Sequence, residues 1–117
     1  MQKTSDIDAM TTLTVSRDGL TREELAHELQ LLGKRWSVVS GELRLELLGT
    51  MAKTGMVAAF AGALAEEINH HPRILLEYAG LRLMVHTQDA TTVTVMDLVY
   101  AARLEQWLRS NTWPEKR

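Results

Sequence analysis

The residues best suited to chemistry lie within residues 66–72, where Glu66 stands four positions before the sequence His70-His71-Pro72. Histidine titrates closest to neutral pH, so neighbouring imidazoles can serve as a proton donor and a proton acceptor. A metal site is less favoured, because adjacent side chains point apart and no further ligand cluster completes the coordination. A purely structural alternative is that the two histidines cap a helix, with Asn69 hydrogen-bonding nearby.

A helix over residues 51–68 must position these histidines. Its apolar residues recur at three- and four-residue spacing: Val57, Phe60, Leu64 and Ile68. Pro72 disfavours helical structure in the residue before it, so His70 and His71 fall at the C-terminal turn. There the negative end of the helix dipole favours a protonated imidazole.

The remaining elements form two hairpins and two further helices. In chain order, the patterns predict a helix that ends at Gly33, strands over residues 36–39 and 42–47, the helix over 51–68, strands over 74–78 and 81–88, and a helix over 95–108. Thr21 with Glu24 marks the start of the first helix as a capping box, and Thr94 with Asp97 marks the start of the last.

This order, α-β-β-α-β-β-α, predicts an α+β fold. Hairpins pair antiparallel strands, so we expect a four-stranded antiparallel sheet with three helices on one face. Alternate strand residues then lie on the open face: Arg44, Glu46, Arg82, Met84 and His86. A small sheet with free edges invites strand-to-strand dimerisation.

Composition limits the other classes of function. The 117 residues suit one domain, predicted at residues 20–117, after a loosely ordered extension over residues 1–19 that could contain a short docked segment. With 13 basic and 15 acidic residues, no basic excess indicates nucleic-acid binding. The absence of cysteine excludes disulfides and thiolate zinc sites. No apolar run reaches the ~18 residues that span a bilayer, so we expect a cytoplasmic protein.

The spacing around the two histidines resembles that of the pterin-4a-carbinolamine dehydratase family. That family has an acidic residue before His-His-Pro, an aromatic residue after it, a third histidine, and an aspartate that opens the last helix. The matching residues here are Glu66, His70, His71, Pro72, Tyr78 and Asp97. The position of the third histidine holds Gln88, and the resemblance covers about residues 20–107.

The resemblance implies dehydration of 4a-hydroxytetrahydrobiopterin by a homodimer or a dimer of dimers, with no metal or other cofactor. His70 and His71 would be catalytic, and five residues would contact the pterin: Glu66, Pro72, Tyr78, His86 and Asp97. Gln88 exchanges no proton usefully, although its amide can hydrogen-bond a pterin. His86 could stand in for the missing histidine, because it shares the predicted strand face with Gln88 at ~6.6 Å.

Two functions therefore remain open. We favour a family member with an incomplete catalytic site that acts as an assembly factor, similar to the branch that accompanies α-carboxysomes and assists assembly of the RuBisCO large subunit. The absent third histidine supports it, as does the loop at residues 89–93, which lacks the family's double glycine. The alternative is an active dehydratase that relies on His70 and His71. A structural domain without pterin chemistry is the least supported reading.

Overall fold

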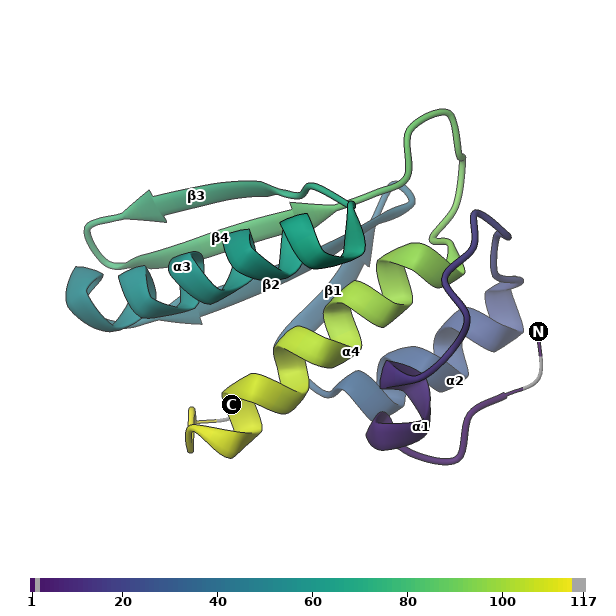
Figure 1. The fold of residues 1–117 in the computed structure, drawn as a ribbon, viewed down its shortest axis with the longest axis horizontal. Helices are drawn as coiled ribbons and strands as arrows, with labels where there is room; N and C mark the ends of the chain where they lie inside the picture. The colour runs from purple at the N-terminus through teal and green to yellow at the C-terminus, as the bar shows by residue number, and fades with distance from the viewer. Residues whose placement is uncertain (2, 115–117) are drawn as a thin grey trace.

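Four antiparallel strands form one sheet, and helices cover one of its faces in the computed structural model (Figure 1). The strands are β1 (Trp36–Val39), β2 (Glu42–Leu48), β3 (Arg73–Glu77) and β4 (Gly80–Val85), in the spatial order β1-β2-β4-β3. The helices are α1 (Ile7–Thr11), α2 (Arg22–Leu32), α3 (Met51–Ile68) and α4 (Val95–Ser110). The structure describes residue 1 and residues 3–114. It confirms the predicted α+β class and adds α1.

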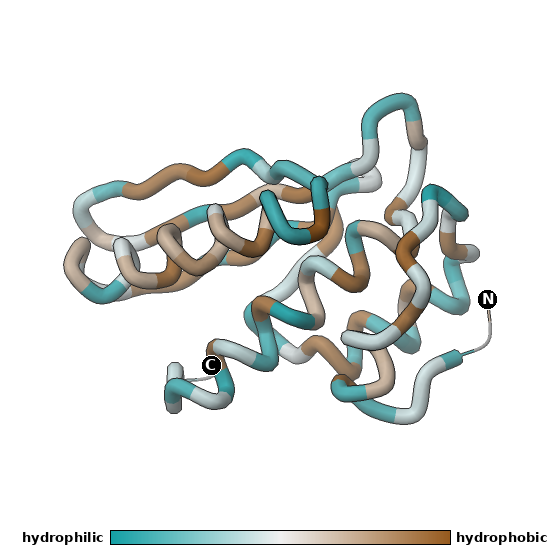
Figure 2. Tube along the Cα trace, viewed as in Figure 1, coloured by the Kyte–Doolittle hydropathy of each residue, from teal (hydrophilic) through white to brown (hydrophobic). Residues whose placement is uncertain are grey.

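The alternation of side chains along the strands separates the core from an open face. Leu45 pairs with Leu83 between β2 and β4, and both are fully buried under the helices. One residue further, Glu46 pairs with Arg82 on the opposite face. In Figure 2, apolar residues recur along the strands and along the helices that cover the sheet. Within the described residues, no helix is long and apolar enough to cross a membrane.

The last strand ends earlier than predicted. β4 stops at Val85, so the expectation that His86 and Gln88 share one strand face is wrong. The chain turns here because Thr87 points inward and is 1 % exposed. The turn is closed by a bond from the Ala90 backbone N to the Thr87 carbonyl O at 3.0 Å.

The N-terminal segment contains a short helix that packs on α4. Met10 in α1 is fully buried, and Arg103 in α4 donates a hydrogen bond to the Thr11 carbonyl at 3.2 Å. Earlier in the chain, the Thr4 hydroxyl donates to the buried carboxylate of Glu28 at 2.6 Å. The docked segment, left open as an alternative to a loose extension, is therefore what the structure shows. A domain boundary at residue 20 stays a prediction.

A buried ion pair joins the turn before β1 to α4. Arg35 donates through Nε and Nη2 to the two carboxylate oxygens of Glu105, each at 3.0 Å. Trp36 Nε1 donates to the same carboxylate at 3.0 Å, and Arg109 Nε does so at 2.7 Å. Arg35 is 4 % exposed and Glu105 is 1 % exposed. Removing the carboxylate charge would leave a buried guanidinium without its counter-ion.

We therefore expect Glu105→Gln to lower the free energy of unfolding by about 3 kcal/mol, in the range found when one partner of a buried pair is lost. The matched control is Glu67→Gln, because the Glu67 side chain is 69 % exposed in its pair with Arg103. That control should change stability by less than ~0.5 kcal/mol. Urea unfolding measures both, and equal midpoints would show that the buried pair contributes nothing.

Candidate functional site

The end of α3 sends its two histidines in different directions. Asn69 terminates the helix in the left-handed conformation, with φ 57° and ψ 48°, which asparagine tolerates better than most residues. The His70 backbone N then donates to the Ala65 carbonyl at 3.0 Å. His70 is 8 % exposed, whereas the His71 side chain is 57 % exposed. The two imidazoles therefore have different surroundings.

His70 belongs to a buried hydrogen-bond network around Asp97. Its Nε2 lies 2.6 Å from Asp97 Oδ1, which also accepts from the Thr87 hydroxyl at 3.0 Å. Asp97 Oδ2 accepts from the Thr94 backbone N at 3.0 Å, and the Thr87 and Thr94 hydroxyls lie 2.6 Å apart. Because Asp97 accepts from every partner, we assign the ring proton to Nε2 of His70. Nδ1 is then the nitrogen left to accept a proton.

Tyr100 borders the buried imidazole on another side. The ring centroids of His70 and Tyr100 lie 6.4 Å apart in an edge-on arrangement. The Tyr100 hydroxyl donates to the Ala61 carbonyl O at 2.7 Å. Burial raises the pKa of Tyr100 far above its ordinary value, so the phenol stays protonated near neutral pH and does not act as a base.

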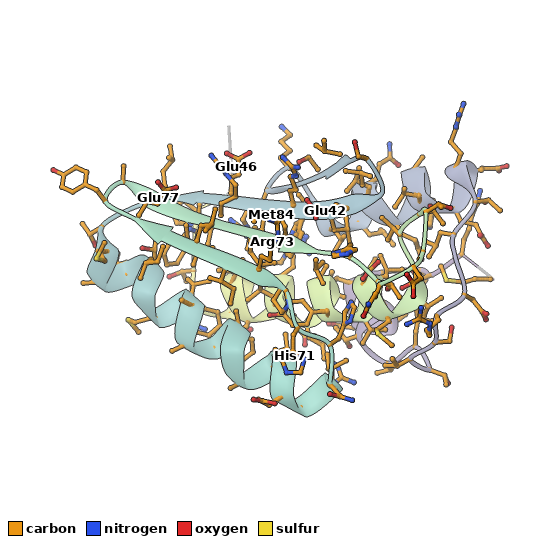
Figure 3. All side chains as sticks on the ribbon, turned by 90° about the horizontal axis from the view of Figure 1, so that it is seen from above. Glu42, Glu46, His71, Arg73, Glu77 and Met84 are labelled. Atoms are coloured by element: carbon orange, nitrogen blue, oxygen red, sulfur yellow. The ribbon has the colours of Figure 1, made fainter. Side chains whose placement is uncertain are left out.

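His71 faces solvent and pairs with Glu66. The distance between His71 Nε2 and Glu66 Oε2 is 3.3 Å, and the Glu66 side chain is 81 % exposed. Figure 3 shows His71 beside the last turn of α3, away from the charged residues labelled on the sheet. The pair can orient the imidazole, although an exposed ion pair contributes little to stability.

The structure places the other predicted site residues apart from this pair. His86 follows β4 and lies 3.9 Å from Glu42, which also pairs with Arg73 on the open face. Gln88 is exposed in the next turn, where its carbonyl O accepts from Arg17 Nη2. Within the described part of the chain, neither side chain hydrogen-bonds to the histidines of the motif.

Tyr78 and Pro72 lie at opposite ends of β3. Pro72 is half-buried directly before the strand, and Tyr78 is 92 % exposed in the turn after it. A five-residue strand spans about 17 Å, so Tyr78 does not meet His71 within one chain.

Two surface grooves, one at the β3–β4 turn and one between β2, α3 and α4, are not lined by His70 or His71.

Sequence reasoning missed Thr87. The capping box of Thr94 and Asp97 was predicted and is present. The Thr87 hydroxyl comes from the segment that follows β4. It points inward because the strand ends at Val85 and not at the predicted residue 88. A threonine seven residues before a capping threonine was the available signal, and it is weak.

No three or more His, Asp or Glu side chains among the described residues gather as a metal site.

The fold and the site together define a class of protein. A four-stranded sheet carries a helix that ends in His-His-Pro, and the first of these histidines is held by the aspartate that opens the last helix. The family model described as "Pterin 4 alpha carbinolamine dehydratase" matches residues 18–107. The chain belongs to this family.

One solved structure shows the same fold. The crystal structure of "transcriptional coactivator/pterin dehydratase" from Brucella melitensis matches with a TM-score of 0.69 and 21% sequence identity. The match covers 76% of this chain and 97% of that chain. No curated protein sequence is similar enough to match.

The two adjacent histidines should differ in their effect on stability. His70→Ala removes a buried hydrogen bond to a carboxylate and should lower the free energy of unfolding by about 2 kcal/mol. His71→Ala removes an exposed side chain and should change it by less than ~0.5 kcal/mol. Urea unfolding of both variants measures the difference. Similar losses in the two variants would contradict the inward and outward placement of the rings.

Proposed function

We propose that this family member works by binding a protein client and has little or no dehydratase activity. One observation carries the proposal: the position of the family's third histidine is an exposed glutamine, Gln88, outside the strand. Of the two histidines that remain, the protonated nitrogen of His70 is already bound to the buried Asp97. Only His71 is open to solvent for proton exchange.

The size of the expected loss follows from general acid–base catalysis. Each positioned acid or base typically contributes about 10² to 10⁴-fold to the rate. His86 does not replace the missing group well, because it leaves the strand and faces Glu42 at 3.9 Å. A site with one accessible imidazole should therefore be slower by at least ~10²-fold than a site with three.

An active dehydratase is the second candidate, and one observation favours it. Each histidine of the motif has a carboxylate partner, Asp97 for His70 and Glu66 for His71. A carboxylate that binds one ring nitrogen fixes the tautomer, so the other nitrogen is left to accept a proton. That arrangement would serve proton transfer if a pterin reached both rings.

A dehydration assay separates these two candidates. The purified protein should not accelerate the loss of water from 4a-hydroxytetrahydrobiopterin above the uncatalysed rate, and His71→Ala should leave that rate unchanged. Stopped-flow absorbance of the quinonoid product measures the rate. A clear acceleration by the wild-type protein that His71→Ala removes would establish the enzyme instead.

The proposed client is the RuBisCO large subunit, and the proposed client surface is the open face of the sheet. Figure 3 shows charged side chains gathered on this face around Met84. The six charged residues on its strands are Glu42, Arg44, Glu46, Arg73, Glu77 and Arg82. The balance of three acidic and three basic groups suits a specific protein surface better than a phosphate backbone. Within the described residues, Arg82 makes no ion pair and remains available to a partner.

The same face borders a strand suited to self-association. β3 is an edge strand, so its outer backbone groups have no partner strand among the residues that the structure describes. Leu75 is 45 % exposed and Leu76 is 39 % exposed along it. Exposed apolar side chains beside free backbone groups support the proposed homodimer, or a dimer of dimers, through β3.

Co-expression tests the client assignment. The yield of assembled RuBisCO should rise when this protein is present, and Gln88→His should leave the gain intact because binding does not use that position. Arg82→Glu should reduce the gain, because it reverses the unpaired charge of the open face. Arg22→Glu is the matched control, since Arg22 is exposed on α2, off the sheet. A yield that is indifferent to the protein would refute the partner.

A further inference from the structure

β2 is longer than the strand that covers its outer side. β1 pairs with β2 only as far as Trp36 opposite Leu45. On its other side, β2 continues to Leu48, which lies opposite Gly80 in β4. Among the described residues, the end of β2 beyond Glu46 therefore has a neighbouring strand on one side only, and it forms a short free edge.

The backbone groups of Leu48 face the side without a strand. In an antiparallel sheet, the hydrogen-bonding groups of successive residues alternate between the two sides of a strand. Glu46 N donates toward the β1 side, to Arg35 O at 3.5 Å, and Gly49 N donates the opposite way, to Ala79 O at 3.1 Å. Leu48 stands two residues after Glu46, so its N–H and C=O point to the β1 side. The described residues supply no strand there.

This free edge borders a groove of about 850 Å³ between β2, the start of α3 and the end of α4. Its apolar lining includes Met56 from α3 together with Trp107 and Trp113. Met56 is 64 % exposed, and Leu48 at the rim is 87 % exposed. Exposed apolar side chains around a concave surface are typical of a docking site.

The far wall of the groove is held in place by the protein itself. Arg35 Nη1 donates to the Trp113 carbonyl O at 3.1 Å, and Trp113 N donates to the Leu108 carbonyl O at 2.9 Å. The Trp107 ring stacks on Phe60 with centroids 4.6 Å apart. A wall that is already ordered lowers the entropy cost of binding.

The charge at the α3 side of the groove indicates the kind of partner. Lys53 is exposed in the first turn of α3, and it forms no ion pair among the described residues. Glu46 also lines the groove, but its side chain belongs to the open face on the β2 side. A negative group is therefore favoured at the α3 side, opposite Lys53.

We propose that this groove binds an extended segment of a partner protein, which adds to the end of β2 as a short strand and places an acidic side chain opposite Lys53. The backbone of Leu48 supplies the hydrogen bonds, as in other complexes where a peptide joins a sheet edge. An apolar side chain of the segment packs against Met56 and Trp107. This inference goes beyond the proposed function and stands on the groove alone, whether or not the client is RuBisCO.

Two synthetic probes test the charge preference. Each is an acetylated and amidated seven-residue peptide of alternating valine and threonine that ends in aspartate in one probe and lysine in the other. The aspartate probe should change tryptophan emission saturably, with a Kd on the order of 0.1 to 1 mM, and bind about tenfold more tightly than the lysine probe. Lys53→Glu should reverse this preference.

A second pair of variants tests the strand addition. Leu48→Pro removes the N–H that faces the groove and should weaken binding of the aspartate probe at least ~10-fold. Leu48→Ala is the matched control, because it shortens the same side chain and keeps the N–H, so its Kd should stay within about twofold. If the proline variant fails to fold by circular dichroism, the charge reversal at Lys53 decides the result.

Three results would overturn the proposal. They are the absence of a saturable change with either probe, equal affinity for both probes in the wild-type protein, and retention of the probe preference by Lys53→Glu. A fourth result would overturn the identity of the occupant, which is proposed to be a partner protein. If light scattering shows that Leu48→Pro halves the mass of the wild-type protein, a second copy of this chain fills the groove in place of a partner.

Discussion

The buried carboxylate of Asp97 is the interaction on which the geometry of the site depends. It accepts hydrogen bonds from His70, Thr87 and the backbone of Thr94, which come from the end of α3, the end of β4 and the start of α4. A fully buried carboxylate is costly unless its oxygens are satisfied, so these three ends must meet at one point. The position of the His-His-Pro turn follows from that requirement.

This constraint separates the folding role of the motif from its chemical role. His70 closes the buried network, and His71 stands in solvent because the left-handed Asn69 ends the helix before them. Whatever the chemistry of the site, the first histidine is needed to satisfy the buried carboxylate of Asp97. The presence of His-His-Pro therefore identifies the family and the fold, and does not by itself establish catalysis.

Sequence reasoning succeeded where the signal was local. Capping boxes and periodic apolar residues predicted α2, α3, α4 and the two hairpins, because each pattern lies within its own element. The end of β4 was misplaced because Thr87 turns inward to reach Asp97, ten residues later. The pairing of Arg35 with Glu105 joins residues 70 positions apart and leaves no local pattern. For the site, the resemblance supplied Glu66, both histidines and Asp97, whereas Tyr78 lies at the far end of β3.

The central position of α4 has a consequence for when this protein folds during its synthesis. α1, α2 and α3 all pack on α4, and Gly19 near the start of the chain pairs with Thr94 immediately before that helix. The ribosome makes α4 after the other three helices, so α1 and α2 leave the exit tunnel before their packing surface exists. The apolar sides of α1, α2 and α3 that pack on α4 therefore stay uncovered until α4 has been made. α1 therefore docks only after α4 has emerged from the ribosome.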